Sequence, residues 1–102
     1  MLQHKYQDQI DRFVCYLQAK RYSEHTIRSY SNAILVFLNH TQKDTLSHID
    51  HHDVIHFNRN YILAKKYSAS YQNQVINAIK LFFETIQYKK LILEKVHRPR
   101  KE

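Results

Sequence analysis

The stretch from residue 68 to residue 86 reads SASYQNQVINAIKLFFETI, and its apolar side chains recur at intervals of three and four positions. This spacing places them on one face of an α-helix. Near its start, Ser68 or Ser70 can cap the helix by accepting a hydrogen bond from a free backbone amide. The stretch therefore predicts a strongly amphipathic helix with an apolar face made of Val75, Ile76, Ile79, Phe82, Phe83 and Ile86.

Two more helices are expected closer to the N-terminus, where apolar residues again recur at helical intervals. The first runs from about Lys5 to Ala19. The second follows the cap residue Ser23 and runs to about Asn39. Cys15 lies in the apolar stretch of the first helix, so we expect a residue of the core or its edge rather than a reactive thiol.

A third helix is expected after a polar connection over residues 41–47. Asp50 can cap this helix, and Asp53 stands three positions later, as a capping box requires. The helix should continue as one element to Lys65 and Lys66, whose charges suit a helix C-terminus. The four helices together predict an all-α fold, and we expect no internal repeat among them.

The composition agrees with a small basic domain. The chain of 102 residues has no glycine and one proline, so it lacks the turn residues of sheet proteins. Its net charge of +7 favours an anionic partner, either nucleic acid or an acidic membrane surface. It has no apolar run near 18 residues and its start is too polar for a signal peptide, so we expect a soluble intracellular protein.

The second and fourth helices resemble the N-terminal, SAM-like core-binding domain of phage integrases, which are tyrosine recombinases. The second helix has the family's serine, threonine and tyrosine at Ser23, Thr26 and Tyr30. The fourth has its asparagine, small residue, basic residue and aromatic at Asn73, Ala78, Lys80 and Phe82. Two positions depart from the family, which commonly has a glycine at Arg21 and a threonine at Tyr71.

The resemblance implies a compact four-helix SAM-like orthogonal bundle over residues 1–95, followed at 96–102 by the start of a basic linker. Such a domain binds double-stranded DNA as one jaw of a clamp around the recombination site, beside other recombinase protomers in a synaptic complex. The family's catalytic chemistry belongs to a further domain, so we expect no enzyme activity in this chain and no nucleophile among its tyrosines. The expected location is the cytoplasm, at the nucleoid when DNA is bound.

Candidate DNA contacts lie on the polar faces of the second and fourth helices. Asn73, Asn77 and Lys80 are spaced to share a face, which can meet both base edges and phosphates. Periodicity alone favours ordinary solvated residues on an amphipathic helix, and the resemblance reverses this preference in favour of the binding role. The candidate set is His25, Thr26, Arg28, Ser29, Asn32, Ser70, Tyr71, Asn73, Gln74, Asn77 and Lys80.

A group of histidines raises the question of a metal site. His52 and His56 are four positions apart and could share one helical face, with His48 and His51 nearby. Without a suitable third ligand, we favour a solvated histidine patch and expect no metal, cofactor or small-molecule substrate. We expect core packing rather than base stacking for Phe13, Tyr30, Phe37, Phe57, Phe82 and Phe83, since all lie on apolar stripes.

One alternative function remains open. The same helices could form a small basic protein-interaction module, in which the positive charge mainly confers solubility. Such a module would bind its partner through an apolar groove and at moderate salt, whereas DNA binding depends steeply on salt.

Overall fold

The computed structural model describes residues 6–42 and 46–86. Its elements, in order, are α2 (Gln7–Ala19), α3 (Glu24–Thr41), η1 (Leu46–His48), α4 (His51–Phe57), η2 (Asn58–Leu63) and α5 (Ala69–Thr85). The segment η1 is a 3₁₀ turn and η2 is π-helical. No strand occurs in these two ranges, and the predicted all-α class is confirmed.

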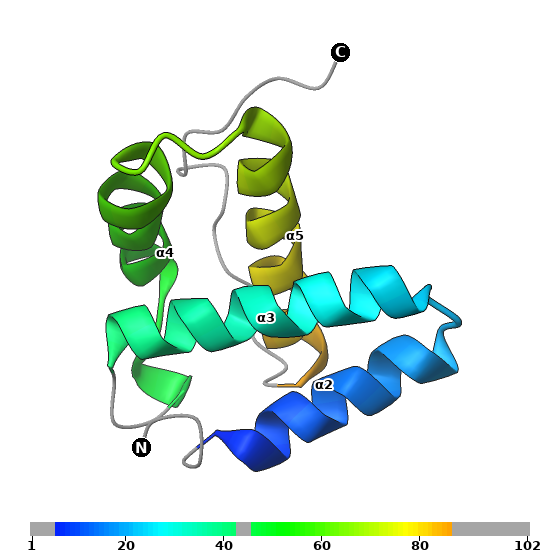
Figure 1. The fold of residues 1–102 in the computed structure, drawn as a ribbon. Coiled ribbons are helices and arrows are strands. Elements are labelled where there is room, and N and C mark those ends of the chain that lie inside the picture. Colours follow the sequence, from blue (N-terminus) through cyan, green and yellow to red (C-terminus); the bar gives the residue numbers. More distant parts are fainter. Residues whose placement is uncertain (1–5, 43–45, 87–102) are drawn as a thin grey trace.

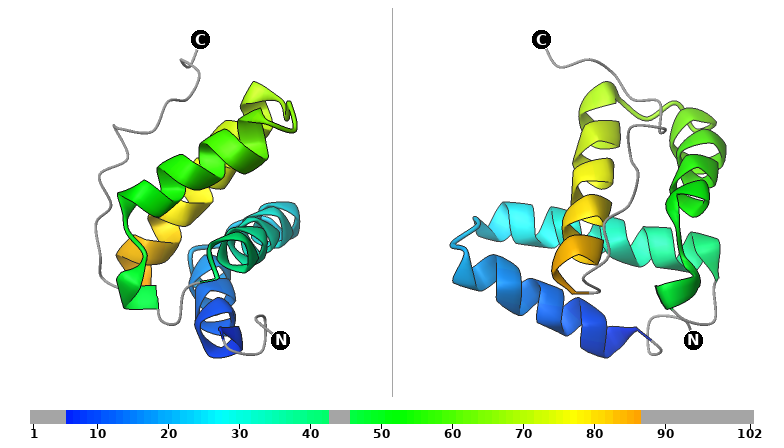
Figure 2. Two further views of the ribbon diagram at one scale, coloured as in Figure 1. Left: turned by 90° about the vertical axis from the view of Figure 1, so that its left-hand side faces the viewer. Right: turned by 180° about the vertical axis from the view of Figure 1, so that it is seen from behind.

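The helices form two hairpins that cross each other (Figure 1). One hairpin consists of α2 and α3, and the other consists of α4 with η2 and α5. Figure 2 shows the same crossing from two further sides. The central element is α3, which packs against α2, α4 and α5. This arrangement is the compact four-helix orthogonal bundle that the resemblance implied.

All five phenylalanines of the chain belong to one chain of ring contacts in the core. Phe13 of α2 meets Phe82 of α5 at a centroid distance of 5.3 Å, and Phe82 meets Phe83 at 5.1 Å. Phe83 meets Phe37 of α3 at 6.3 Å, and Phe37 meets Phe57 of α4 at 5.2 Å. The rings are nearly perpendicular, which is the favoured edge-to-face geometry. The predicted core role of these residues is confirmed, because each is buried.

The starts of α3 and α5 are fixed by serine caps. Ser23 Oγ accepts a hydrogen bond of 3.1 Å from the amide of Thr26. Ser68 Oγ accepts an equal bond of 3.1 Å from the amide of Tyr71. Of the two serines that could cap α5, the structure selects Ser68.

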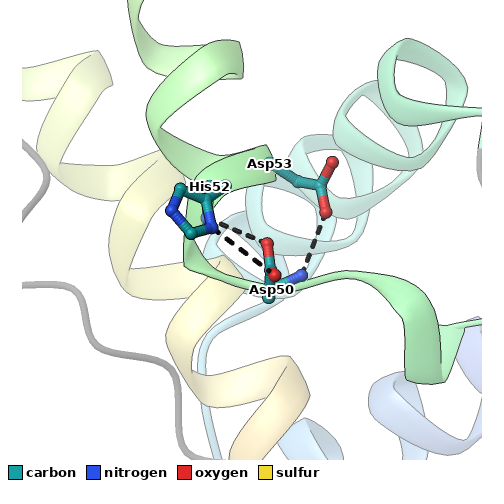
Figure 3. A network of polar contacts seen from close by, with 3 residues as sticks. All are labelled: Asp50, His52 and Asp53. Carbon is teal, nitrogen blue, oxygen red and sulfur yellow. Dashed lines mark hydrogen bonds and ion pairs between the residues drawn. The ribbon is translucent and has the colours of Figure 1, made fainter.

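The start of α4 is a capping box, as predicted (Figure 3). The amide of His52 donates to Asp50 Oδ1 at 3.0 Å, and the amide of Asp50 donates to Asp53 Oδ2 at 3.0 Å. Burial acts to raise the pKa of Asp50, but the hydrogen bonds from His52 and Asp53 and the charge of the His52 ring outweigh it. The pKa of Asp50 therefore lies below its ordinary value of 3.8.

The third helix is not the single element that the sequence predicts. The α-helix ends at Phe57 and the chain continues as π-helical η2. Asn58 opens this wider turn and is buried at 4% exposure, where its Oδ1 accepts a 2.8 Å hydrogen bond from Gln72 Nε2 of α5. Apolar spacing predicted an ordinary α-helix because a π turn is rare and its hydrogen bonds span only one residue more than those of an α-helix.

The expected place of Cys15 at the core or its edge is wrong, because Cys15 is exposed. It lies two residues from both Phe13 and Leu17, which are buried, and positions two apart on a helix point to opposite sides. Lys5 and residues 87–102 lie outside the described residues. The expected linker at 96–102 is among them, so the proposed boundary at residue 95 stays a prediction.

The ring chain predicts a large effect of one substitution on stability. Phe83→Ala should lower the free energy of unfolding by about 3 to 5 kcal/mol, because it removes a buried ring and leaves a cavity. Leu81→Ala removes a half-buried side chain from the same helix and should cost much less. Chemical denaturation of both variants checks this. A loss below about 1 kcal/mol for Phe83→Ala would contradict the central place given to the rings.

The capping box predicts a pH dependence of stability. Because the folded-state pKa of Asp50 is lowered, its ionised form stabilises the fold above pH 4, and this contribution disappears as the pH falls through the lowered pKa. Asp50→Asn keeps a capping oxygen but cannot titrate, so the fall in melting temperature between pH 5 and pH 2 should become shallower. Asp50→Ala should lose about 0.5 to 2 kcal/mol at neutral pH instead. An unchanged acid profile in Asp50→Asn would refute this assignment.

Candidate nucleic-acid interface

The outer face of α5 carries a polar stripe made of Asn73, Asn77 and Lys80. Asn77 and Lys80 are exposed and Asn73 is half-buried, whereas Val75 and Phe82 are buried on the opposite side of the helix. The three polar residues follow one another at intervals of four and three positions, so they lie in line along the helix. We call them the outer stripe of α5. The division of this helix into two faces follows the predicted pattern.

The other predicted residues of α5 lie around the first half of the helix. Ser70 is exposed and Gln74 is half-buried. Tyr71 is half-buried, and its ring lies 4.5 Å from the ring of Tyr67. Burial and then the neighbouring Tyr67 raise the pKa of Tyr71 above its ordinary value of 10.0.

The outer stripe meets the start of α3 at a shallow hollow of about 240 Å³. Its lining combines residues of both helices, namely Tyr22, Tyr30, Asn77, Lys80, Leu81 and Glu84. Glu84 was not among the predicted residues, although its position four residues after Lys80 could have revealed it. Tyr22 gave no local signal, because its place beside α5 depends on how the two hairpins cross.

The predicted residues at the start of α3 have different surroundings. Ser23 Oγ donates a 3.0 Å hydrogen bond to Thr26 Oγ1, so the Thr26 side chain takes part in the cap. His25 is exposed and Ser29 is half-buried. Thr26 therefore has a structural role at the helix start that the sequence did not indicate.

Arg28 and Asn32 line a different depression from the one that contains Asn77 and Lys80. They border an open groove of about 690 Å³ between α2 and α3. Much of its wall is apolar and consists of Ile10, Val14, Ile27 and Leu35. The structure thus divides the predicted set, with Arg28 and Asn32 beside α2 and the outer stripe beside Tyr22 and Tyr30.

Tyrosine hydroxyls near the start of α5 form a pair. Tyr61 Oη and Tyr67 Oη are 3.3 Å apart. This hydrogen bond, followed by burial and by the neighbouring Tyr67 and Tyr71, raises the pKa of Tyr61 to about 12. Tyr61 is therefore a neutral hydroxyl at physiological pH and not a phenolate.

Two pairs of histidine rings lie close together in the part of the chain that the structure describes. The ring centroids of His51 and His52 are 4.1 Å apart, and those of His40 and His56 are 5.4 Å apart. Burial and then His56 lower the pKa of His40. Within residues 6–42 and 46–86, no three His, Cys, Asp or Glu side chains form a group that could hold a metal ion. The contact between His40 and His56 joins α3 to α4 and was not apparent from spacing.

An acidic membrane surface was the other anionic partner that the charge of the chain allowed. Within the described ranges, no helix has the length and apolar character needed to cross a membrane.

The fold defines a class, a small basic all-α domain built from two crossed helical hairpins. The family model of the phage integrase N-terminal SAM-like domain matches residues 10–93. The chain therefore belongs to the phage integrase family through this domain, as its two helical patterns indicated. Neither a curated protein nor a solved structure matches the chain. Membership places the domain in the context of DNA integration and recombination.

Proposed function

We propose that this domain binds double-stranded DNA as one jaw of the clamp of a site-specific tyrosine recombinase. The observation that carries the proposal is the outer stripe of α5, where two asparagines and a lysine stand opposite a buried face that is apolar except for Gln72. The net charge of +7 and the membership in the integrase family support it.

The residue types of the stripe suit the two tasks of DNA recognition. A lysine such as Lys80 gains affinity by meeting a phosphate and releasing condensed counterions. An asparagine such as Asn73 can pair with both the N6 amine and the N7 of an adenine in the major groove. His25 and Ser70 lie at the exposed starts of α3 and α5, where they can add contacts to the phosphate backbone of DNA.

In this account the domain grips DNA and does not cut it. Cleavage and rejoining belong to a separate catalytic domain of the recombinase. The partners are duplex DNA and further recombinase protomers in a synaptic complex, and the place of action is the nucleoid in the cytoplasm.

A second candidate function rests on the groove between α2 and α3. Its apolar wall of Ile10, Val14, Ile27 and Leu35 could accept an amphipathic helix of a protein partner. Arg28 and Asn32 at its rim would then contact that partner rather than DNA. Binding in this groove would persist at moderate salt, because apolar burial and not counterion release would drive it.

The proposal predicts weak binding of duplex DNA with a steep dependence on salt. A single domain of this size can reach on the order of 4 to 7 phosphates, so log Kd should change with log salt with a slope near 4 to 6. Fluorescence anisotropy with a labelled duplex measures this slope. Binding that is absent at low salt, or that is flat as salt increases, would exclude the electrostatic contact.

The outer stripe predicts that its residues act on binding and not on folding. Lys80→Ala should lower the salt slope by about one unit, and Asn73→Ala should cost roughly 1 to 3 kcal/mol on a cognate site if it pairs with a base. Phe83→Ala serves as the contrasting variant, since its loss should appear in the melting temperature. If the Lys80 and Asn73 variants melt earlier while DNA affinity per folded molecule is unchanged, the stripe is structural.

A further inference from the structure

An eight-residue sequence occurs twice in the chain, once before α3 and once before α5. Residues 16–23 read YLQAKRYS and residues 61–68 read YILAKKYS, with identical residues at five of the eight positions. Our expectation of no internal repeat is therefore wrong. Each copy spans the end of one helical element and the cap of the next, so a comparison of one helix sequence with another does not detect the repeat.

The two copies adopt the same backbone conformation. Arg21 and Lys66 are both left-handed, with φ of 64° and 59°. In each copy the amide of the next residue, Tyr22 or Tyr67, donates to the carbonyl five positions earlier at 3.1 Å. This bond closes the preceding helix in a Schellman motif. The serine that follows then caps the next helix, with φ and ψ of −66° and 155° in one copy and −66° and 159° in the other.

The lysine at the fifth position of each copy lies near the ring of the tyrosine at the first position. Lys20 Nζ lies 5.9 Å from the ring centroid of Tyr16, and Lys65 Nζ lies 5.1 Å from that of Tyr61. Both distances are within the range of a cation–π contact. Each copy therefore holds one ammonium group against its own tyrosine ring.

The next two residues of each copy face solvent. Arg21 and Lys66 are exposed, and Tyr22 and Tyr67 are exposed by 37% and 40%. Each copy thus presents two adjacent cations beside an exposed tyrosine. We call these two surfaces the basic turns, and no acidic residue lies within either repeat.

The basic turns lie at two different corners of the domain. One joins α2 to α3 at one end of the horizontal hairpin in Figure 1, and the other leads into α5 at the top of the vertical hairpin. Because α5 starts just after the turn at Lys66 and the outer stripe runs along α5, this turn lies at the N-terminal end of the stripe. The turn at Tyr22 also borders the hollow that contains Lys80.

We propose that the two basic turns are a matched pair of contacts to the phosphate backbone of duplex DNA, one near each end of the outer stripe. This inference rests on the proposed function and adds Arg21 and Lys66 to its contacts. The cations, and not the helix starts, would make these contacts. At each helix start the amide of Thr26 or Tyr71 already donates its hydrogen bond to the capping serine. Repetition of the same charge pair at two corners suits a polyanion whose charges repeat at regular intervals.

The two basic turns should contribute equally, additively and without regard to base sequence. Arg21→Gly and Lys66→Gly each remove a cation while leaving a residue that accepts positive φ. Each should lower the salt slope by about 0.9, and the double variant by about 1.8, with the same change on cognate and unrelated duplexes. The melting temperatures of these variants should stay the same or rise. A second pair, Arg21→Asn and Lys66→Asn, also removes the cations and also tolerates the left-handed conformation.

The matched control is Arg12→Ala with Arg59→Ala, which also lowers the net charge from +7 to +5 by removing two exposed arginines. This control should change the slope much less. A slope change in the basic-turn variant no larger than in the control would overturn the inference. The proposed function would survive that result if Lys80→Ala still lowers the slope, and would itself fail if the unmodified chain shows no salt-dependent binding. Basic-turn-dependent binding to phosphatidylserine vesicles, with an unchanged slope on DNA, would assign the turns to lipid and overturn the inference as well.

Discussion

The edge-to-face contacts of five phenylalanines hold the two hairpins across each other, and the position of every surface residue depends on them. Phe82 and Phe83 are neighbours on α5, yet one ring meets α2 and the other meets α3. This arrangement fixes how α5 is rotated about its own axis. Once Phe82 points inward, the outer stripe with Asn77 and Lys80 points away from the core. The recognition surface is therefore a consequence of how the core packs.

The core packing determines how α5 is rotated about its axis, and the helix ends determine where each residue lies along its helix. Ser23 and Ser68 each fix the first turn of a helix, and the left-handed residues Arg21 and Lys66 stop the preceding element just before it. The chain has no glycine, so these positions are occupied by side chains that also carry charge. Local turn chemistry and the distribution of surface charge thus depend on the same residues. In this way a small basic domain can place cations at defined corners without extra structure.

Much of the fold follows from the sequence, because helical spacing and caps are local. The aromatic core, the capping box at Asp50 and the two faces of α5 were all predicted in this way. The π-helical turn at Asn58 was not, because a π turn is rare and apolar spacing does not distinguish it from an α-helix. The buried bond from Asn58 to Gln72, fourteen residues away, was not apparent from local spacing either. The site was predicted less completely, since spacing cannot show that Arg28 borders α2 or that Tyr22 borders Lys80. Those relations depend on how the hairpins cross, which no local pattern encodes.

The central claim is that the outer stripe of α5 and the start of α3 face DNA, and amide chemical shifts measured during a duplex titration test it most directly. With ¹⁵N-labelled protein at low salt, the account predicts that shifts concentrate at Ser70, Asn73, Asn77, Lys80 and at residues 21–29. Amides of Ile10, Val14 and Leu35 along the groove between α2 and α3 should change little. Shifts confined to that groove, with the outer stripe of α5 unaffected at saturating DNA, would contradict the account.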